Sequence, residues 1–228
     1  MPQASGAELE YLAGDRAYVE RRYAEARRIF LPLAQSGHAK SQTQLGILLT
    51  EEDKGFYDLP GGIAWLEKAA AQGEPRAYLN LGLMYSSGTK DKKLVADREK
   101  AASWMQKAAE AGNVHGQRNL AYYYTQGFGV PRNPELGIAW FEKAAAQGDR
   151  NSQYNLGIAY YNGKGVTADG KAARKWFEMA ALQGDKEAAL QLVHLFSDGR
   201  LLPQDNLRSS CWLQVVTKGG NPRMCVGS

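Results

Sequence analysis

The sequence lacks the features that define several large classes of protein. It has only two cysteines in 228 residues, and no window approaches 18 uninterrupted apolar residues. These absences exclude a disulfide-dense scaffold and argue against membrane insertion. The 28 basic and 24 acidic residues leave a net charge of +4, and the one short basic cluster is Lys90-Asp91-Lys92-Lys93. Since nucleic-acid binders carry extended basic patches, we expect no nucleic-acid partner.

Motifs for catalysis and metal binding are missing as well. The three histidines, His38, His115 and His194, are far apart in the sequence, and no His-Glu-x-x-His or Cys-x-x-Cys motif occurs. No Gly-x-Ser-x-Gly motif marks a nucleophile elbow. We therefore expect no enzyme activity, no metal and no cofactor. A catalytic group assembled from distant parts of the chain remains the alternative.

Glycine, by contrast, is abundant, and many of its 25 copies fall on a regular period. The segment Lys-Ala-Ala-Ala-Gln-Gly occurs at 68–73 and again at 143–148, with variants at 107–112 and 179–184. The glycines that close these segments and their equivalents are 36, 39, 36, 36 and 36 residues apart: Gly37, Gly73, Gly112, Gly148, Gly184 and Gly220. Recurrence at this length is typical of repeat proteins.

Aromatic and aliphatic residues follow the same period. All five tryptophans are in register, and a recurrent leucine is followed four residues later by Leu or an aromatic residue. Residues at i and i+4 share one helix face, and the small residue beside the leucine lets a second helix approach closely. Each repeat is thus predicted to be a helical hairpin; in the fifth, the helices span about 149–162 and 169–183, Gly184 ends the second, and Asp185 caps the next.

The predicted fold is an all-α, right-handed α/α superhelical solenoid of about six hairpins. We expect one domain over residues 1–228, because each hairpin buries its apolar face only against its neighbours. The expected units are about 8–37, 38–73, 74–112, 113–148, 149–184 and 185–220, with 221–228 as a C-terminal cap. The first unit has a tighter loop than the others, the second has Glu51–Leu59 in place of a Gly-x-Gly-Val loop, and the third carries the insertion 90–97.

The repeat resembles a known family. Asn-Leu-Gly-x-x-Tyr-x-x-Gly-x-Gly-Val and Ala-x-x-Trp-Phe-x-x-Ala-Ala-x-Gln-Gly, read from Asn155 to Gly184, are similar to the Sel-one-like repeats, relatives of the tetratricopeptide repeats, and the similarity extends over residues 8–220. It implies a non-enzymatic adaptor that binds a partner protein or peptide in a concave groove, in many cases in the bacterial envelope. An alternative is an immunity protein that neutralises a secreted toxin such as a type VI lipase effector. Another is a weak hydrolase of penicillin-like compounds, although those relatives are rich in paired cysteines.

The resemblance also suggests where a partner binds. In related repeats the first helix of each hairpin lines the concave face, so positions on it that vary between repeats are candidates for partner contacts. The predicted contact residues are Arg76, Leu79, Leu83, His115, Arg118, Asn119, Tyr122, Asn151, Tyr154, Asn155, Ile158 and Tyr161. Tyrosine and arginine are common at binding hot spots.

Three features of the sequence have both a structural and a binding interpretation. Tyr122, Tyr154 and Tyr161 could serve only to pack neighbouring helices. The amide that precedes each recurrent leucine could bind a peptide backbone, but its uniform recurrence favours a hydrogen bond within the stack; the amides are Gln44, Asn80, Asn119, Asn155 and Gln191. The cluster Lys90-Asp91-Lys92-Lys93 is expected to be a solvated loop, with contact to an acidic partner as the alternative.

The two cysteines lie near the C-terminus, on either side of Gly219-Gly220. A hairpin that turns at these glycines would bring Cys211 and Cys225 opposite each other. We predict a disulfide that clips the last hairpin, with two buried free thiols as the alternative. A disulfide implies an oxidising compartment, so the expected location is periplasmic, or secreted after signal removal; the alternative location is the cytoplasm.

Overall fold

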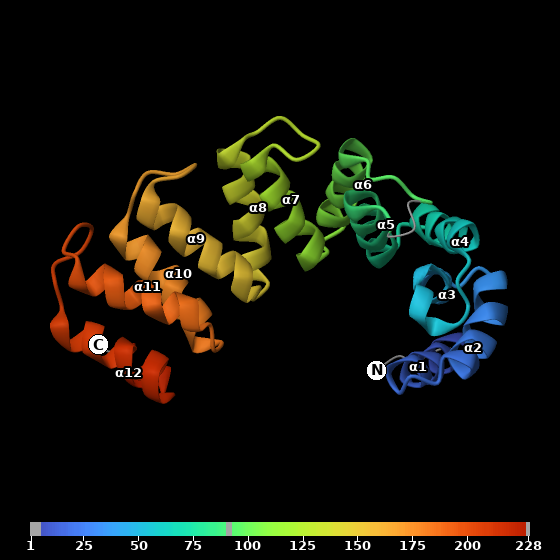
Figure 1. Cartoon of the computed structure of the whole chain (residues 1–228), viewed down its shortest axis with the longest axis horizontal. Helices are drawn as coiled ribbons and strands as arrows, with labels where there is room; N and C mark the ends of the chain where they lie inside the picture. The colour runs from blue at the N-terminus through green and yellow to red at the C-terminus, as the bar shows by residue number, and fades with distance from the viewer. Residues whose placement is uncertain (1–5, 90–92, 227–228) are drawn as a thin grey trace. The chain divides into compact units, whose positions relative to one another are not determined.

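The computed structural model describes residues 6–89 and 93–226. Within these ranges it contains twelve α-helices and two short 3-10 helices, and no strand. The chain divides into two compact units, Met1–Asn113 and Val114–Ser228, and each contains six of the α-helices (Figure 1). The predicted all-α class is confirmed. That residues 1–228 form one continuous solenoid remains a prediction.

The first unit consists of three helical hairpins, in which each helix packs against the next. Its helices are α1 (Gly6–Val19), α2 (Tyr23–Gln35), α3 (Ala39–Thr50), η1 (Glu52–Lys54), α4 (Leu59–Ala71), α5 (Pro75–Ser87) and α6 (Arg98–Glu110). The short connection between α1 and α2 agrees with the tighter loop expected there. In the insertion of the third repeat, Lys90, Asp91 and Lys92 lie outside the described residues.

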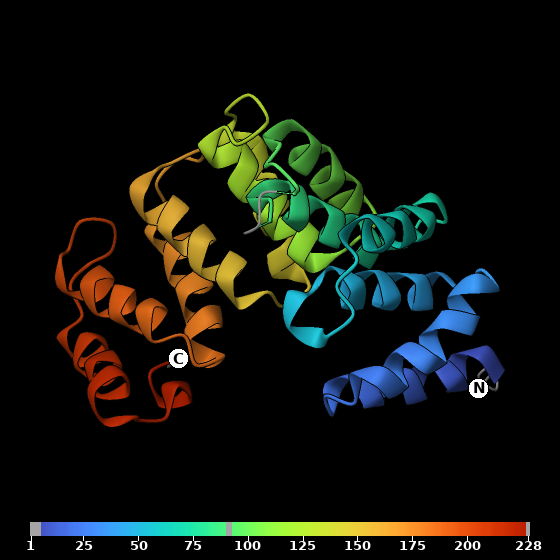
Figure 2. The ribbon, with the colours of Figure 1, turned by 45° about the vertical axis from the view of Figure 1, so that its right-hand side comes forward.

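The second unit also consists of three hairpins, which Figure 2 shows as antiparallel pairs. Its helices are α7 (Val114–Gln126), α8 (Pro134–Ala146), α9 (Arg150–Asn162), α10 (Gly170–Leu182), α11 (Lys186–Ser197), α12 (Asn206–Lys218) and η2 (Pro222–Met224). Adjacent hairpins stack through α8 on α9 and α10 on α11. The first helices, α7, α9 and α11, therefore recur once per repeat, as the sequence period predicts.

The repeat boundaries are fixed by capping residues. Asp169 begins α10 by accepting a hydrogen bond from the Lys171 N–H at 2.8 Å. Gly184 follows the end of α10 at a φ of +86°, a left-handed conformation that favours glycine. The carboxylate of Asp185 then accepts from the Ala188 N–H at 3.0 Å and begins α11. These boundaries are as predicted, except that the left-handed glycine after α12 is Gly219 rather than Gly220.

Small residues let the two helices of a hairpin approach closely. A Cβ atom on Gly157 of α9 would lie 2.4 Å from Cδ1 of Phe177 on α10. In the α7–α8 hairpin the glycine is on the second helix instead, where a Cβ on Gly137 would lie 2.9 Å from the carbonyl oxygen of Ala121. The last hairpin has Val193 and Ser209 at these two positions, so its helices cannot pack in the same way.

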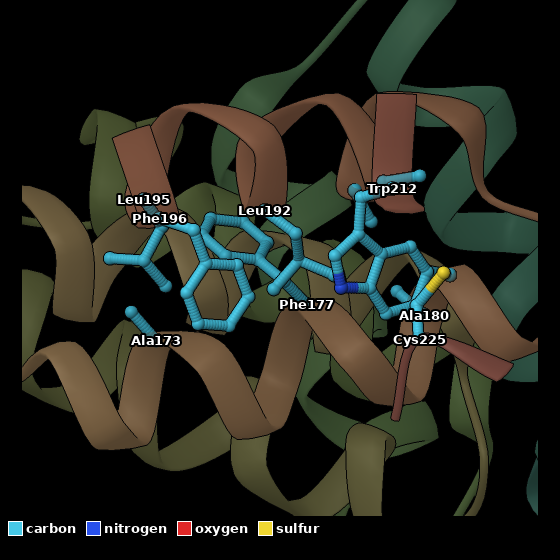
Figure 3. Packing of buried hydrophobic residues seen from close by; sticks show 11 residues of the cluster. Ala173, Phe177, Ala180, Leu192, Leu195, Phe196, Trp212 and Cys225 are labelled. Atoms are coloured by element: carbon cyan, nitrogen blue, oxygen red, sulfur yellow. The ribbon is translucent and has the colours of Figure 1, made fainter. Parts of the chain in front are cut away.

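This difference changes what the last helix buries. In the four preceding hairpins the tryptophan is half-buried and the next residue is in the core, as with Trp176 and Phe177. In α12 the burial of these two positions is reversed: Trp212 is fully buried and Leu213 is 46% exposed. Figure 3 shows the Trp212 indole in the core of the last hairpins, beside Ala180 and Cys225. The large indole fills the space between α10, α11 and α12.

Candidate functional site

The predicted contact residues lie on first helices of the hairpins in both units. Arg76, Leu79 and Leu83 are on α5 of the first unit, and the other nine are on α7 and α9 of the second. We use the name helix-A face for the surface of α7 and α9 that carries His115, Tyr122, Asn151, Tyr154, Ile158 and Tyr161. His115 and Asn151 on this face are exposed, and Tyr154, Ile158 and Tyr161 are half-buried.

Two tyrosines of the helix-A face are fixed by the second helix of their own hairpin. The Tyr122 ring meets the Phe141 ring edge to face, with centroids 5.1 Å apart, and the Tyr154 ring lies 6.0 Å from Phe177. Tyr122 is nevertheless 37% exposed. Its hydroxyl accepts a hydrogen bond of 2.7 Å from the Asn155 amide. These rings therefore pack within the stack and also present an edge at the surface.

Charge near Tyr154 is negative. Burial raises the pKa of the Tyr154 hydroxyl, and the Glu187 and Asp185 carboxylates raise it further. Both carboxylates belong to the next hairpin, at the beginning of α11. The phenol of Tyr154 is therefore held neutral, as a hydroxyl that can donate or accept a hydrogen bond.

Arg118, one of the predicted contact residues, forms an ion pair with the next hairpin. Its Nη1 lies 2.8 Å from Oδ2 of Asp149, and the two side chains are 20% and 8% exposed. The other oxygen of Asp149 accepts from the Ser152 N–H at 2.7 Å and caps α9. Arg118 thus joins α7 to the start of the next hairpin, and its replacement would disturb the stack as well as any binding site.

Tyr161 is also engaged by a neighbouring repeat. Its hydroxyl donates to the Asp198 carboxylate, and the guanidinium of Arg200 lies 4.1 Å from the centre of its ring. Arg200 also donates to the Tyr161 carbonyl at 2.7 Å. The Asp198 hydrogen bond is the main cause of a raised pKa at Tyr161. This arrangement fastens the segment after α11 to the end of α9.

The residues on α5 differ in how much surface they offer. Arg76 is exposed and Leu83 is 45% exposed, whereas Leu79 is only 9% exposed. The prediction that Leu79 contacts a partner is therefore corrected, since the stack covers its side chain. Arg76 borders a small hollow of about 170 Å³, together with Tyr11, Lys40, Thr43 and Glu74. A comparable hollow of about 280 Å³ on the second unit is bordered by Arg118 and Asn151.

The recurrent amides make contacts within the fold. The Gln44 amide donates to Asp15, and Asn80 donates to the Arg76 carbonyl of its own helix at 2.7 Å. Asn155 bonds to the Asn151 carbonyl at 2.6 Å as well as to Tyr122. These contacts agree with the structural alternative. Asn119 is half-buried on α7.

A second set of amides, which the sequence analysis missed, connects the two helices of a hairpin. The glutamine that ends the second helix donates to a glutamine on the first, in the pairs Gln72–Gln42 at 2.7 Å, Gln147–Gln117 at 2.8 Å and Gln183–Gln153 at 2.8 Å. In the third repeat both positions change together, to Tyr78 and Ala111. The two glutamines occur together in three repeats and are both absent from the third repeat. This joint occurrence is the sequence signal that could have identified these contacts.

The structure forms the predicted disulfide at the C-terminal end. The Cys211 and Cys225 sulfurs are 1.97 Å apart and their Cα atoms 5.6 Å apart. Cys225 is 4% exposed and packs in the same core cluster as Trp212. The bridge therefore holds the segment after α12 against the end of the second unit.

In residues 6–89 and 93–226, no group of three or more His, Cys, Asp or Glu side chains has the arrangement of a metal site. None of the helices in these ranges has the length and apolar character needed to cross a membrane.

Comparison with known proteins identifies the repeat. The profile of the Sel1 repeat matches four consecutive segments, residues 39–74, 75–113, 114–149 and 150–185. None of the curated proteins matches this chain. The matched segments correspond to the second to fifth hairpins, which share the tryptophan and glycine periods.

Solved structures with the same fold extend the similarity to most of the chain. A protective antigen of uropathogenic Escherichia coli with an SLR fold is 30% identical at a TM-score of 0.83; the match covers 94% of this chain but only 46% of that one. A Sel1 repeat protein from Oxalobacter formigenes is 28% identical at a TM-score of 0.78, with 93% and 83% covered. An immunity protein from Pseudomonas aeruginosa is 20% identical at a TM-score of 0.55, and the match covers 96% of this chain and 83% of that one. This likeness concerns the fold alone.

Proposed function

Because the chain belongs to the Sel1 repeat family, whose fold typically serves as a protein-interaction scaffold, we propose that it is a non-enzymatic adaptor that binds a partner protein or peptide on its helix-A face. In such a fold one hairpin is repeated, and the stacked hairpins form an extended surface for binding. Surface residues of the first helices can differ between repeats without changing the stack. The partner is held by residues that differ between repeats, while the recurrent residues maintain the stack.

The observation that carries this proposal is the fixed pair of tyrosines on the helix-A face. Tyr122 and Tyr154 each rest on a phenylalanine of the second helix, so little side-chain entropy remains to be lost on binding. Exposed polar residues, His115 and Asn151, lie on the same face. Rigid aromatic edges beside adaptable polar groups are the composition expected of a binding hot spot.

The test uses substitutions that leave the stack intact. His115→Glu with Asn151→Arg changes two exposed residues and keeps the net charge. Glu135→Arg with Lys164→Glu is the matched control, because both residues are exposed outside the helix-A face. A partner is first isolated with the purified chain from a bacterial envelope extract, and its affinity for each variant is then measured by calorimetry.

We expect the helix-A variant to bind at least tenfold more weakly and the control to bind as the parent chain does. Equal affinities for all three proteins would contradict the assignment of the site. Failure to obtain a stoichiometric complex would contradict the adaptor role itself.

The proposed location is the bacterial periplasm or the exterior. Its support is the Cys211–Cys225 disulfide, because such bridges persist in oxidising compartments. Alkylation of free thiols in the denatured, unreduced protein from its native host tests this location. Two labelled cysteines would instead favour the cytoplasm.

Two other roles, an immunity protein and a weak hydrolase, predict different results. An immunity protein would form one tight complex with a toxin and protect cells that produce it, whereas an adaptor bridges two components of an assembly. Likeness to the Pseudomonas immunity protein concerns the fold only, so the adaptor is our first proposal. Hydrolysis of a chromogenic penicillin-like compound by the purified chain, with no protein partner found, would favour the weak hydrolase.

A further inference from the structure

One column of surface residues changes in charge from repeat to repeat. It consists of the residue five positions before the recurrent leucine of each first helix, and all of its members are exposed: Lys40, Arg76, His115, Asn151 and Glu187. The first unit carries the two cations. In the second unit the column runs from a histidine through a neutral amide to a carboxylate. It thus continues the helix-A face onto α11, where it ends in a negative charge.

Glu187 is a free carboxylate at this end of the column. Asp185, two residues earlier, has both oxygens occupied, because Nε of Arg150 lies 3.6 Å from Oδ2 and the Ala188 N–H donates to Oδ1 at 3.0 Å. In the part of the chain that the structure describes, Glu187 has no ion pair and no hydrogen bond. Lys186 precedes it, but adjacent residues of a helix do not face each other. Glu187 therefore presents its charge to the surface.

The hydroxyl of Tyr154 lies near this charge. Burial raises the pKa of Tyr154 most, and the Glu187 carboxylate raises it further. The Tyr154 ring packs against the core cluster that contains Ala188 and Ala189, the residues that follow Glu187. Among the described residues, however, the Tyr154 hydroxyl has no hydrogen-bond partner. A group with several N–H donors could therefore bond both the carboxylate and the hydroxyl.

The ring of Tyr154 is suited to a cation. It is half-buried and fixed against Phe177, with ring centroids 6.0 Å apart. Aromatic rings attract cations through their quadrupole, and a fixed ring loses little entropy on binding. Arg118, at the position of Tyr154 in the preceding repeat, is already paired with Asp149 at 2.8 Å. The cation that Glu187 and Tyr154 would bind must therefore come from another molecule.

Glu187 also has a structural interpretation, because an acidic residue in the first turn of a helix is stabilised by the helix dipole. The chain offers a matched residue for this role. Glu187 is the second residue of α11, and Glu135 is the second residue of α8. Both are exposed, but Glu135 lies on a second helix, outside the column. A comparison of the two glutamates therefore separates the dipole effect from partner binding.

We propose that Glu187 and Tyr154 bind an arginine side chain of the partner protein. The guanidinium pairs with the Glu187 carboxylate, donates a further hydrogen bond to the Tyr154 hydroxyl and lies against the Tyr154 ring. Arginine fits better than lysine, because its planar group has five N–H donors and stacks on aromatic rings, whereas the ammonium of lysine is a strongly hydrated point charge. The inference rests on the proposed function, since it names the chemistry of the partner that binds the helix-A face.

The first experiment uses the full chain and a synthetic peptide, Ala-Arg-Ala-Arg-Ala, with both ends blocked. Binding is followed by NMR through the Glu187 carboxyl carbon and the Tyr154 ring signals, and we expect both to shift and saturate. The peptide with lysine in place of arginine should bind about threefold more weakly. The peptide with citrulline, which has a similar shape but no charge, should cause no saturable shift. Equal affinity of the lysine or citrulline peptide, or no shift with the arginine peptide, would overturn the proposal.

Three variants locate the bound arginine. Glu187→Gln should weaken peptide binding about fivefold, because an exposed ion pair and a cation–π contact each contribute modestly. Glu135→Gln makes the same change in net charge at the matched position and should leave the affinity nearly unchanged. Tyr154→Phe keeps the ring, removes the hydroxyl and should weaken binding about threefold. Equal losses in the two glutamate variants, or unchanged affinity in Tyr154→Phe, would refute the site.

Failure of this inference can be distinguished from failure of the proposed function. We expect the isolated partner, like the peptide, to bind Glu187→Gln about fivefold more weakly. A partner whose affinity falls in His115→Glu with Asn151→Arg but not in Glu187→Gln would refute the arginine contact and leave the adaptor role intact. Binding of the arginine peptide at Glu187, with no partner complex obtained, would contradict the adaptor role and support the arginine site.

Discussion

At the scale of single residues, side chains that reach beyond their own hairpin are often tied to the next one. Arg118 pairs with Asp149, Tyr161 donates to Asp198, and Asn155 donates to Tyr122. Each contact spans more than 30 positions of the sequence, close to one repeat. Polar residues on the first helices therefore link successive hairpins, and only those without such a role are suitable for a binding test.

The Tyr161–Asp198 contact predicts a pH dependence. Burial alone would raise the pKa of Asp198, but the hydrogen bonds from Tyr161 and from the Arg200 N–H, with the Arg200 charge, outweigh it and hold the pKa below its ordinary value of 3.8. A carboxyl with a lowered pKa in the folded protein stabilises it above the unfolded pKa, and this contribution is lost as the pH falls through the folded pKa.

We expect the Asp198 carboxyl, followed by carbon-13 NMR, to titrate below pH 3.8 in the parent protein and closer to 3.8 in Tyr161→Phe. The stability difference between the two proteins should shrink as the pH falls below this range. Identical midpoints in both would show that the Tyr161 hydroxyl has no influence on the carboxyl.

The close approach at Gly157 predicts a second residue-scale effect. Gly157→Ala forces a methyl group onto the Phe177 ring, whose nearest carbons would be 2.4 and 2.5 Å away. Both residues are buried, and overpacking of this kind costs about 1–3 kcal/mol. Gly82→Ala is the control, since its new methyl would meet the flexible Met105 at 2.9 Å and should cost less.

Denaturant unfolding of Gly157→Ala, Phe177→Leu and the double variant measures this effect. The leucine makes room for the methyl group, so the double variant should lose less stability than the two single losses added together. Additive losses would mean that the ring and the glycine do not limit the approach of α9 and α10.

Sequence reasoning at this scale succeeded where one residue has one local role and failed where a side chain has a distant partner. Capping by Asp185 and the left-handed Gly184 follow from local backbone requirements. The partner of Arg118 does not, because its carboxylate begins a different hairpin. Burial of Leu79 depends on how the neighbouring helices cover α5, which a position in the repeat does not specify.

At the scale of secondary-structure elements, α12 is the helix that departs from the repeat. All five tryptophans occupy one sequence register, yet only Trp212 is fully buried. The sequence predicted the helix and its tryptophan but not this orientation, which occurs where Val193 and Ser209 replace the smaller residues of the preceding hairpins. The Ser209 hydroxyl instead bonds to the Val193 carbonyl at 3.2 Å.

This orientation predicts unequal effects of tryptophan substitutions. Trp212→Ala should cost about 3–5 kcal/mol, because it empties a fully buried site. Trp140→Ala should cost less, since Trp140 is half-buried and its outer face is covered by Lys143 at 3.7 Å. Equal losses of stability in denaturant unfolding would contradict the special position of α12.

A conservative variant separates packing from polarity at the same site. The Trp212 indole nitrogen has no hydrogen-bond partner among the described residues, and burying an unpaired donor is unfavourable. Trp212→Phe removes that donor and keeps most of the ring, so it should cost much less than Trp212→Ala.

At the scale of the whole molecule, stability is distributed along a series of hairpins. The period of 36 residues was sufficient to predict the hairpins and their order, because each is a local structure with its own caps. A repeat array behaves approximately as a sum of units and their interfaces, so a contact within one hairpin mainly stabilises that hairpin and its neighbours. The segment after α12 is held by the disulfide and contains the 3-10 helix Pro222–Met224.

Reduction of the disulfide should therefore destabilise one end of the molecule and leave distant hairpins nearly unaffected. The bridge closes a loop of about 15 residues, for which the chain-entropy model gives about 3 kcal/mol. We expect a reductant to lower the melting temperature of the second unit and to increase hydrogen exchange most in α11 and α12, with little change in α1 to α4. Cys211→Ser with Cys225→Ser should behave like the reduced protein and be insensitive to reductant. A uniform increase in exchange along the whole chain would show instead that the hairpins unfold as one cooperative body, in which a clip at one end stabilises all of them.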